Sequence, residues 1–242
     1  MSTFVLVHGS WHDGSAYEPI ADRLEARGHD AYAPTIAGHG PDADRDVDHA
    51  DCTRSIVEFL VDNDLKEVVL HGHSFGGTVI AKVAEAIPER LDRLVFQNAF
   101  VPADGNSLLD EVPPSYRTLF SRLVDGSDDD TVMLPFEVWR ERFINDADPE
   151  LARSAYEELS PEPFQPFRDE LEMSEFFSLD LPTSYINATE DTALPQSSEW
   201  CWHPRMSSRL ELFRLVQLPG SHEVVFTDPD GLTDAIVRAG RE

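Results

Sequence analysis

Short runs of mainly apolar residues alternate along this chain with segments whose apolar residues recur at helical spacing. Runs with the length and character of strands buried in a parallel sheet lie at 3–7, 68–70, 94–98, 184–188 and 212–216. Segments with the spacing of amphipathic helices lie at 17–24, 52–60 and 78–84. This alternation predicts the α/β class, in which a mainly parallel sheet is flanked by helices.

The alternation breaks between about residues 106 and 178. This stretch is rich in prolines and acidic clusters, and its apolar residues, such as Trp139 and Phe143, fall at helical spacing. We interpret 106–178 as a mostly helical cap that is inserted into a core made of 1–105 and 179–242. Most of its bulky side chains should bury the cap against the sheet, and a few should line an apolar pocket.

Residues 72–77 read Gly-His-Ser-Phe-Gly-Gly and stand between a strand-like run and a helical pattern. This is a G-x-S-x-G segment in the strand–turn–helix context that a nucleophilic serine requires. Gly72 and Gly76 flank Ser74 at positions where side chains would clash across a tight turn. The pattern therefore predicts that Ser74 is a nucleophile, and a glycine-rich turn with a structural serine is the alternative.

A nucleophilic serine needs a base, and the base needs an acid that orients it. In this architecture the acid precedes the histidine along the chain. His222 follows a late strand and is preferred over His203, which precedes a proline. Asp191 follows the strand before that one and is preferred over Glu190, with Asp104 a weaker candidate after an earlier strand.

The loop after the first strand is predicted to complete an oxyanion hole. One donor would be the backbone N–H of Phe75, the residue after the nucleophile. The other would be the N–H of Ser10, since Gly9 lets the backbone approach the substrate oxygen. His8 and His12 belong to the same loop, and we expect them to orient it by hydrogen bonds rather than to act as acids or bases.

Together these residues resemble the α/β-hydrolase superfamily, and within it the group of plant methyl-ester esterases and (S)-selective hydroxynitrile lyases. The matching stretches are 4–9 with His12, Gly28-His29, 72–77, Asp191 with Leu194-Pro195, and 220–222. The resemblance implies an α/β-hydrolase fold with a Ser74, Asp191 and His222 triad. The lyases carry a threonine where Gly9 stands and a lysine where Glu223 stands, so both departures favour ester hydrolysis.

We therefore predict a serine carboxylic-ester hydrolase that acts on small uncharged esters through an acyl-enzyme intermediate. Gly9, Trp11 and Trp139 are the predicted substrate-contacting residues. Two alternatives stay open: a carbon–carbon lyase of hydroxynitrile lyase type, and a non-hydrolytic small-molecule receptor on the same fold. No cluster has metal-ligand spacing, so neither a metal nor a cofactor is expected, and Cys52 and Cys201 are predicted to be buried free thiols.

The charge of the chain is unusual. The formal net charge is −27, from 46 acidic and 19 basic residues among 242. Self-repulsion of this size opposes compaction, and it argues against nucleic acid or a membrane as partner. We interpret it as adaptation to a high-salt cytoplasm, with compositional drift in a GC-rich genome as the alternative. We expect a cytoplasmic location, because no signal peptide or membrane span is visible. We also expect a monomer or homodimer.

Overall fold

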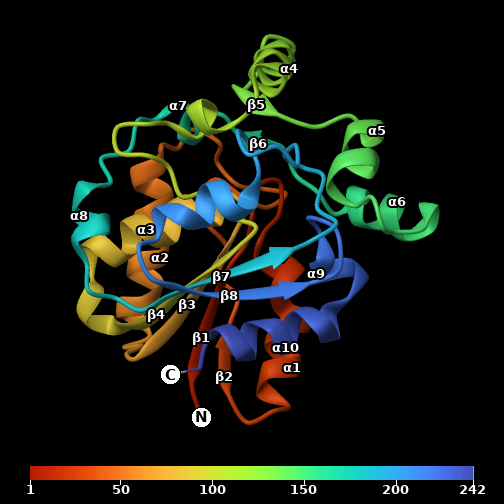
Figure 1. The fold of residues 1–242 in the computed structure, drawn as a ribbon. Coiled ribbons are helices and arrows are strands. Elements are labelled where there is room, and N and C mark those ends of the chain that lie inside the picture. Colours follow the sequence, from red (N-terminus) through yellow and green to blue (C-terminus); the bar gives the residue numbers. More distant parts are fainter. Residues whose placement is uncertain (242) are drawn as a thin grey trace.

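Six parallel strands form the central sheet in the computed structural model, which describes residues 1–241 (Figure 1). The strand order is β2-β1-β3-β4-β7-β8, and every neighbouring pair is parallel. The strands are β1 (Thr3–Val7), β2 (Asp30–Tyr32), β3 (Val68–His73), β4 (Leu91–Gln97), β7 (Thr183–Ala188) and β8 (Phe213–Leu218). The predicted α/β class with a mainly parallel sheet is confirmed.

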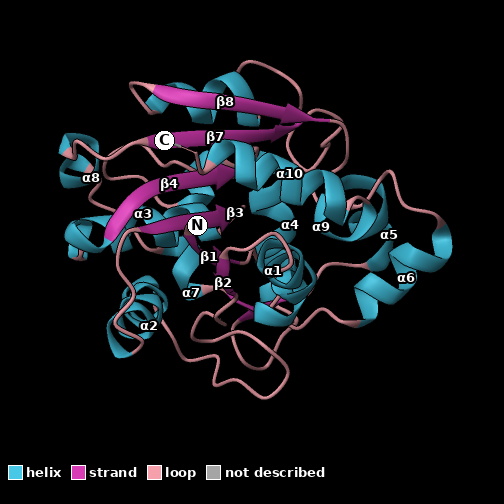
Figure 2. Ribbon diagram, turned by 90° about the horizontal axis from the view of Figure 1, so that it is seen from below, coloured by secondary structure: helices cyan, strands magenta, loops and turns pink. Residues whose placement is uncertain are grey.

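Helices cover both faces of this sheet (Figure 2). On one face α1 (Glu18–Glu25) packs against α10 (Pro229–Ala239), and on the other α2 (His49–Asp62) packs against α3 (Gly76–Ala86). Each face encloses its own cluster of buried apolar side chains. Burial on both faces explains why the strands appear in the sequence as continuous apolar runs.

Helix α2 illustrates how local sequence sets these elements. Its buried residues include Cys52, Ile56 and Leu60, which recur every four positions and form one apolar stripe. The Asp48 side chain accepts a hydrogen bond from Asp51 N, and the Asp51 side chain accepts one from Asp48 N. This capping box starts the helix before the predicted first residue, because the polar first turn lacks the apolar spacing that periodicity detects.

The segment between β4 and β7 supplies several short helices and one pair of strands. Its elements are η3 (Leu108–Glu111), α4 (Pro114–Val124), β5 (Thr131–Val132), α5 (Phe136–Val138), η4 (Trp139–Phe143), α6 (Pro149–Glu157), β6 (Glu162–Pro163), α7 (Gln165–Arg168) and α8 (Ser174–Ser178). We call 106–178 the cap segment. In Figure 1, α4, α5 and α6 lie at the end of the molecule opposite to the chain termini.

The helical character expected of the cap segment is present, but the antiparallel pairing of β5 with β6 was not expected. Strands of two residues are too short to show any alternation in sequence. The division of the chain into a core of 1–105 and 179–242 and an inserted cap of 106–178 stays a prediction.

The remaining short helical elements are η1 (Gly14–Tyr17), η2 (Pro88–Arg90), η5 (Trp202–Met206), η6 (Ser207–Arg209) and α9 (Val224–Thr227). Cys52 and Cys201 are free and buried, as expected. Within 1–241, no helix has both the length and the apolar character needed to cross a membrane.

Candidate active site

Ser74 lies at the sharp turn between β3 and α3. Its φ of 51° falls in the left-handed region that non-glycine residues rarely adopt. A Cβ atom added to Gly72 would meet Gly76 O at 2.6 Å, and one added to Gly76 would meet His8 O at 2.5 Å. The predicted strand, turn and helix are therefore present, and both glycines are required by close backbone contacts. Phe75 follows at the N-cap of α3.

His222 and Asp191 form a buried pair beyond the last residues of β8 and β7. His222 Nδ1 lies 2.6 Å from Asp191 Oδ2, and both side chains are almost completely buried. The other oxygen of Asp191 accepts a hydrogen bond from Ala193 N at 2.7 Å. Burial alone would lower the pKa of His222, but the charge and the hydrogen bond of Asp191, together with the charge of Glu223, outweigh burial and raise this pKa above its usual value.

The alternative acids Asp104 and Glu190 and the alternative base His203 have different surroundings. An oxygen of Asp104 accepts two backbone N–H bonds from the cap segment, and Glu190 is exposed. His203 is hydrogen-bonded to a serine hydroxyl at 2.7 Å. Among the predicted acids, Asp191 alone contacts His222 in the described part of the chain.

The His222 ring is held beside the pocket that contains Ser74. The indole of Trp202 stacks on it with centroids 5.2 Å apart, and the Phe143 ring meets it edge-on at 5.4 Å. Ser74, Trp202 and Phe143 all line one pocket. Within residues 1–241, Ser74 Oγ makes no hydrogen bond to His222, and such contacts commonly tighten only when substrate binds.

The loop after β1 lies against the nucleophile. A Cβ added to Gly9 would be 3.1 Å from the Ser74 Cβ. His8 Nε2 accepts a hydrogen bond from Ile36 N at 3.0 Å, so its Nδ1 carries the proton that is donated to Gly9 O at 2.8 Å. Burial, and then the charge of a neighbouring histidine, lower the pKa of His8 and keep its ring neutral.

This contact of His8 orients the predicted oxyanion donor. The Gly9–Ser10 peptide is planar, so a fixed Gly9 carbonyl also fixes the direction of the Ser10 N–H. The expectation that His8 orients the loop by hydrogen bonding is confirmed. His12 likewise makes a hydrogen bond, to Glu223 Oε2 at 3.1 Å.

The pocket beside Ser74 is small and apolar. Its free volume is about 30 Å³, and it is lined by Ser10, Trp11, Ser74, Phe100, Leu108, Val112, Tyr116, Phe120, Phe143, Phe167, Ala193, Leu194 and Trp202. Trp11 thus lies where the sequence predicted a substrate contact. Trp139 does not line this pocket: it is fully buried, and its ring stacks on Phe143 with centroids 5.7 Å apart.

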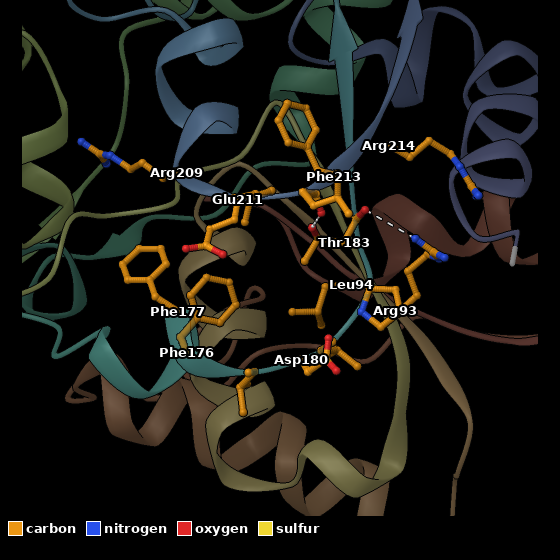
Figure 3. Close-up of a pocket in the computed structure, with 15 residues that line it drawn as sticks. Arg93, Leu94, Phe176, Phe177, Asp180, Thr183, Arg209, Glu211, Phe213 and Arg214 are labelled. Carbon is orange, nitrogen blue, oxygen red and sulfur yellow. Dashed lines mark hydrogen bonds between the residues drawn. The ribbon is translucent and has the colours of Figure 1, made fainter.

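A separate cavity of about 500 Å³ lies at the opposite edge of the sheet (Figure 3). Arg93, Thr183 and Phe213 line it and belong to the first halves of β4, β7 and β8. Asp191 and His222, by contrast, follow the last residues of β7 and β8. Since parallel strands point the same way, this cavity is remote from the predicted catalytic residues.

One described group of side chains has the spacing of metal ligands. Ligand atoms of His73, His222 and Glu223 all lie within 4.8 Å of one another, and all three residues are buried. Two of the three already have protein partners, because His222 is bonded to Asp191 and Glu223 to His12. The expectation that the protein needs no metal or cofactor stays a prediction.

Two residues of the site were not identified from the sequence. Asn98 Nδ2 donates to Asp191 Oδ2 at 2.5 Å, and Glu162 Oε2 accepts from Trp11 N at 2.7 Å. Asn98 follows β4 at the edge where the other site residues gather, and this position was a usable signal. Glu162 lies between two prolines of the cap segment, and nothing in the neighbouring sequence indicates that it contacts Trp11.

Comparison with known proteins identifies similar chains. The profile of the alpha/beta hydrolase family matches residues 4–235. Among solved structures, an extracellular alpha/beta-hydrolase from a Paenibacillus species is 40% identical, covers 100% of both chains and superposes with a TM-score of 0.97. That protein is described as sharing structural and functional homology with tobacco salicylic acid binding protein 2.

Two of the curated relatives are similar over shorter stretches. A carbendazim hydrolyzing esterase from a Nocardioides species is 38% identical over 116 residues, or 47% of this chain and 48% of that protein. Methylesterase 1 of Arabidopsis thaliana is 39% identical over 110 residues, or 43% of this chain and 41% of that protein. The matched stretches thus span less than half the length of these two relatives.

Proposed function

The chain belongs to the alpha/beta hydrolase family, and from this premise we propose that it is a serine carboxylic-ester hydrolase acting through an acyl-enzyme intermediate. The observation that carries the proposal is the buried His222–Asp191 pair, held beside the pocket in which Ser74 stands on a strained turn. Membership of the family alone does not decide the chemistry, because function depends on the site.

In the proposed mechanism Ser74 Oγ attacks the ester carbonyl while His222 removes its proton. The negative charge that develops on the carbonyl oxygen is stabilised by the N–H groups of Ser10 and Phe75. Asp191 holds the imidazole in place and stabilises its protonated form. His222 then gives the proton to the leaving alcohol. In the second half of the reaction His222 removes a proton from a water molecule, which attacks the acyl-enzyme, and returns the proton to Ser74 Oγ as the acid leaves.

The pocket favours small uncharged esters. None of the described residues that line it is charged, so a substrate carboxylate would be buried there without a counter-ion. Its free volume of about 30 Å³ is small, which favours small substrate groups over bulky ones.

The surroundings of His222 disfavour the lyase alternative. Glu223, the next residue, is 1% exposed, and its carboxylate is paired with His12 at 3.1 Å. A buried carboxylate so close to the base would repel a departing cyanide ion, which a lysine at this position would attract. Gly9 likewise offers no hydroxyl to the substrate.

The test is a panel of p-nitrophenyl and methyl esters of graded size, assayed beside mandelonitrile with wild type and Ser74→Ala. We expect ester turnover that Ser74→Ala reduces by several orders of magnitude in a folded variant, with negligible cyanide release. Retention of a tenth of the wild-type activity would move the nucleophile elsewhere. Cyanide release comparable to ester cleavage, and dependent on Ser74, would favour the lyase.

The cytoplasmic location stays a prediction, and the similar Paenibacillus protein is described as extracellular. The monomeric or homodimeric state and the adaptation to salt also stay predictions.

A further inference from the structure

Trp11, the residue after the predicted oxyanion donor Ser10, has a strained backbone. Its φ of 65° lies in the left-handed region, which is unfavourable for a bulky residue unless its surroundings hold it there. Three hydrogen bonds do so. Trp11 N donates to Glu162 Oε2 at 2.7 Å, Ser160 N donates to Trp11 O at 2.9 Å, and the indole Nε1 donates to Val132 O at 2.9 Å.

All three partners belong to the cap segment. Val132 lies on β5 and Glu162 on β6, and these two residues are directly paired in the antiparallel ladder. Ser160 lies two positions before Glu162. The β5–β6 pair therefore contacts the amide and the side chain of Trp11, and Ser160, just before β6, contacts its carbonyl.

Glu162 also contacts a second residue near the oxyanion hole. His39 Nε2 lies 3.2 and 3.1 Å from the two carboxylate oxygens, and both side chains are fully buried. The His39 ring stacks on Phe75, whose N–H is the other predicted oxyanion donor, with centroids 5.8 Å apart. One carboxylate thus connects the loop that carries Ser10 with a ring that packs on Phe75.

The buried Glu162 carboxylate requires an opposite charge and hydrogen-bond donors close to it. Removing a carboxylate from water is strongly unfavourable unless an opposite charge and hydrogen bonds replace its hydration. Burial lowers the pKa of His39, but the charge and the hydrogen bond of Glu162, together with a hydrogen bond to Ala37, outweigh burial and raise this pKa overall. The pair is therefore stabilised as an ion pair, and the remaining acceptor capacity of Glu162 is used by the Trp11 amide.

The peptides on both sides of Ser10 are thus fixed. His8 holds the Gly9 carbonyl on one side, and Glu162 holds the Trp11 amide on the other. We propose that Glu162 is a positioning residue for the oxyanion hole, by which the cap segment sets the direction of the Ser10 N–H. This inference rests on the proposed function, because an oxyanion hole matters only if Ser74 attacks a carbonyl.

A purely structural role for Glu162 would have a different effect on stability and on kcat. If the carboxylate only fastened the cap segment to the core, its loss would lower stability and leave the chemistry of the folded enzyme unchanged. An oxyanion hole stabilises the transition state more than the bound substrate. Its displacement should therefore lower kcat while KM changes little.

The experiment compares Glu162→Ala and Glu162→Gln with the matched control Glu157→Ala, an exposed glutamate at the end of α6. For each folded variant, kcat and KM are measured with p-nitrophenyl acetate. The affinity for an aryl trifluoromethyl ketone, which forms a tetrahedral adduct with the serine, is measured in parallel. Ser74→Ala is assayed in the same series.

We expect Glu162→Ala to lower kcat by about 10- to 100-fold, somewhat less than the loss of a whole oxyanion donor, and to weaken the ketone adduct by a similar factor. KM should stay within about threefold, as it should in the control. Glu162→Gln should recover most of kcat. Its amide oxygen can accept from Trp11 N, and its NH₂ can donate to a neutral His39, whose Nδ1 contacts Ala37 O at 3.0 Å.

A kcat of Glu162→Ala equal to that of Glu157→Ala, or a Glu162→Gln variant as impaired as Glu162→Ala, would overturn the inference. If Glu162→Ala does not fold, Glu162→Asp decides, since its shorter side chain cannot reach both partners: a wild-type kcat overturns the inference, and a reduced kcat at unchanged KM supports it. Ester turnover that depends on Ser74 but not on Glu162 refutes this inference alone. Absence of Ser74-dependent turnover refutes the proposed function and the inference together.

Discussion

Asn98 donates a hydrogen bond from Nδ2 to Asp191 Oδ2 at 2.5 Å, the same oxygen that lies 2.6 Å from His222 Nδ1. Asn98 Oδ1 in turn accepts from Ala188 N at 2.6 Å. The amide thus connects the end of β4 with the end of β7 and holds the Asp191 carboxylate. A carboxylate held in this way fixes the orientation of the imidazole that it contacts.

Substitution of Asp191 tests the assignment of the acid. Asp191→Asn should reduce turnover by roughly 10⁴-fold, because the amide favours the wrong tautomer of His222. Asp104→Asn is the matched control, since Asp104 contacts backbone N–H groups of the cap segment and not His222. Steady-state kinetics of both folded variants measure the effect. A mild Asp191→Asn beside a crippling Asp104→Asn would reverse the assignment.

Substitution of Asn98 tests its contact with the acid. Asn98→Ala should lower kcat by about tenfold, and it should cost about 1–3 kcal/mol of stability because Asp191 and Ala188 N each lose a buried partner. Urea denaturation and kinetics on the same preparation separate the two effects. Wild-type values in both measurements would show that the hydrogen bonds contribute neither to stability nor to catalysis.

The charge next to the base should appear in the pH dependence of activity. His222 must be neutral to accept a proton, so activity should rise as pH rises through its pKa. Although burial lowers this pKa, the charge and hydrogen bond of Asp191 and the charge of Glu223 together raise it above its usual value. Glu223→Gln should therefore move the acidic limb of kcat/KM to lower pH, whereas Glu211→Gln, at an exposed site, should not. An acidic limb that moves to higher pH in Glu223→Gln would contradict the assignment of His222 as the base.

Gly9 should tolerate no side chain. A methyl group there would lie 2.8 Å from His73 Nδ1 and 3.1 Å from Ser74 Cβ, so the loop that carries Ser10 must shift. Gly9→Ala should lower kcat by about 10- to 100-fold. Gly126→Ala serves as the control, since its methyl group would have no contact closer than 3.5 Å. Equal kcat values for the two variants would show that the loop adjusts without cost.

Added salt should stabilise the protein. A net charge of −27 cannot be neutralised by internal pairing, and the resulting repulsion is screened over about 10 Å at 0.1 M salt and about 3 Å at 1 M. Melting temperatures should therefore rise with KCl, mostly below about 1 M if simple screening is the whole effect. A flat or falling melting temperature would leave the acidic composition without a role in adaptation to salt.

The sequence by itself determined five of the six strands of the sheet, the helices α1, α2 and α3, and the turn at Ser74. These features are local: an apolar run, a helical period and two glycines around a serine each act over a few residues. The order of Asp191 and His222 after successive strands could also be predicted, because the carboxyl ends of neighbouring parallel strands lie at one edge of a sheet.

Only the tertiary structure decided what surrounds these residues. Asn98 meets Asp191 across 93 positions of the chain, Trp11 meets Glu162 across 151, and His12 meets Glu223 across 211. No local period or spacing encodes such pairs, since they arise from the packing of the cap segment and the loops on the finished sheet. For the same reason the sequence predicted that Trp139 contacts the substrate, whereas in the structure Trp139 stacks on Phe143 and does not line the pocket.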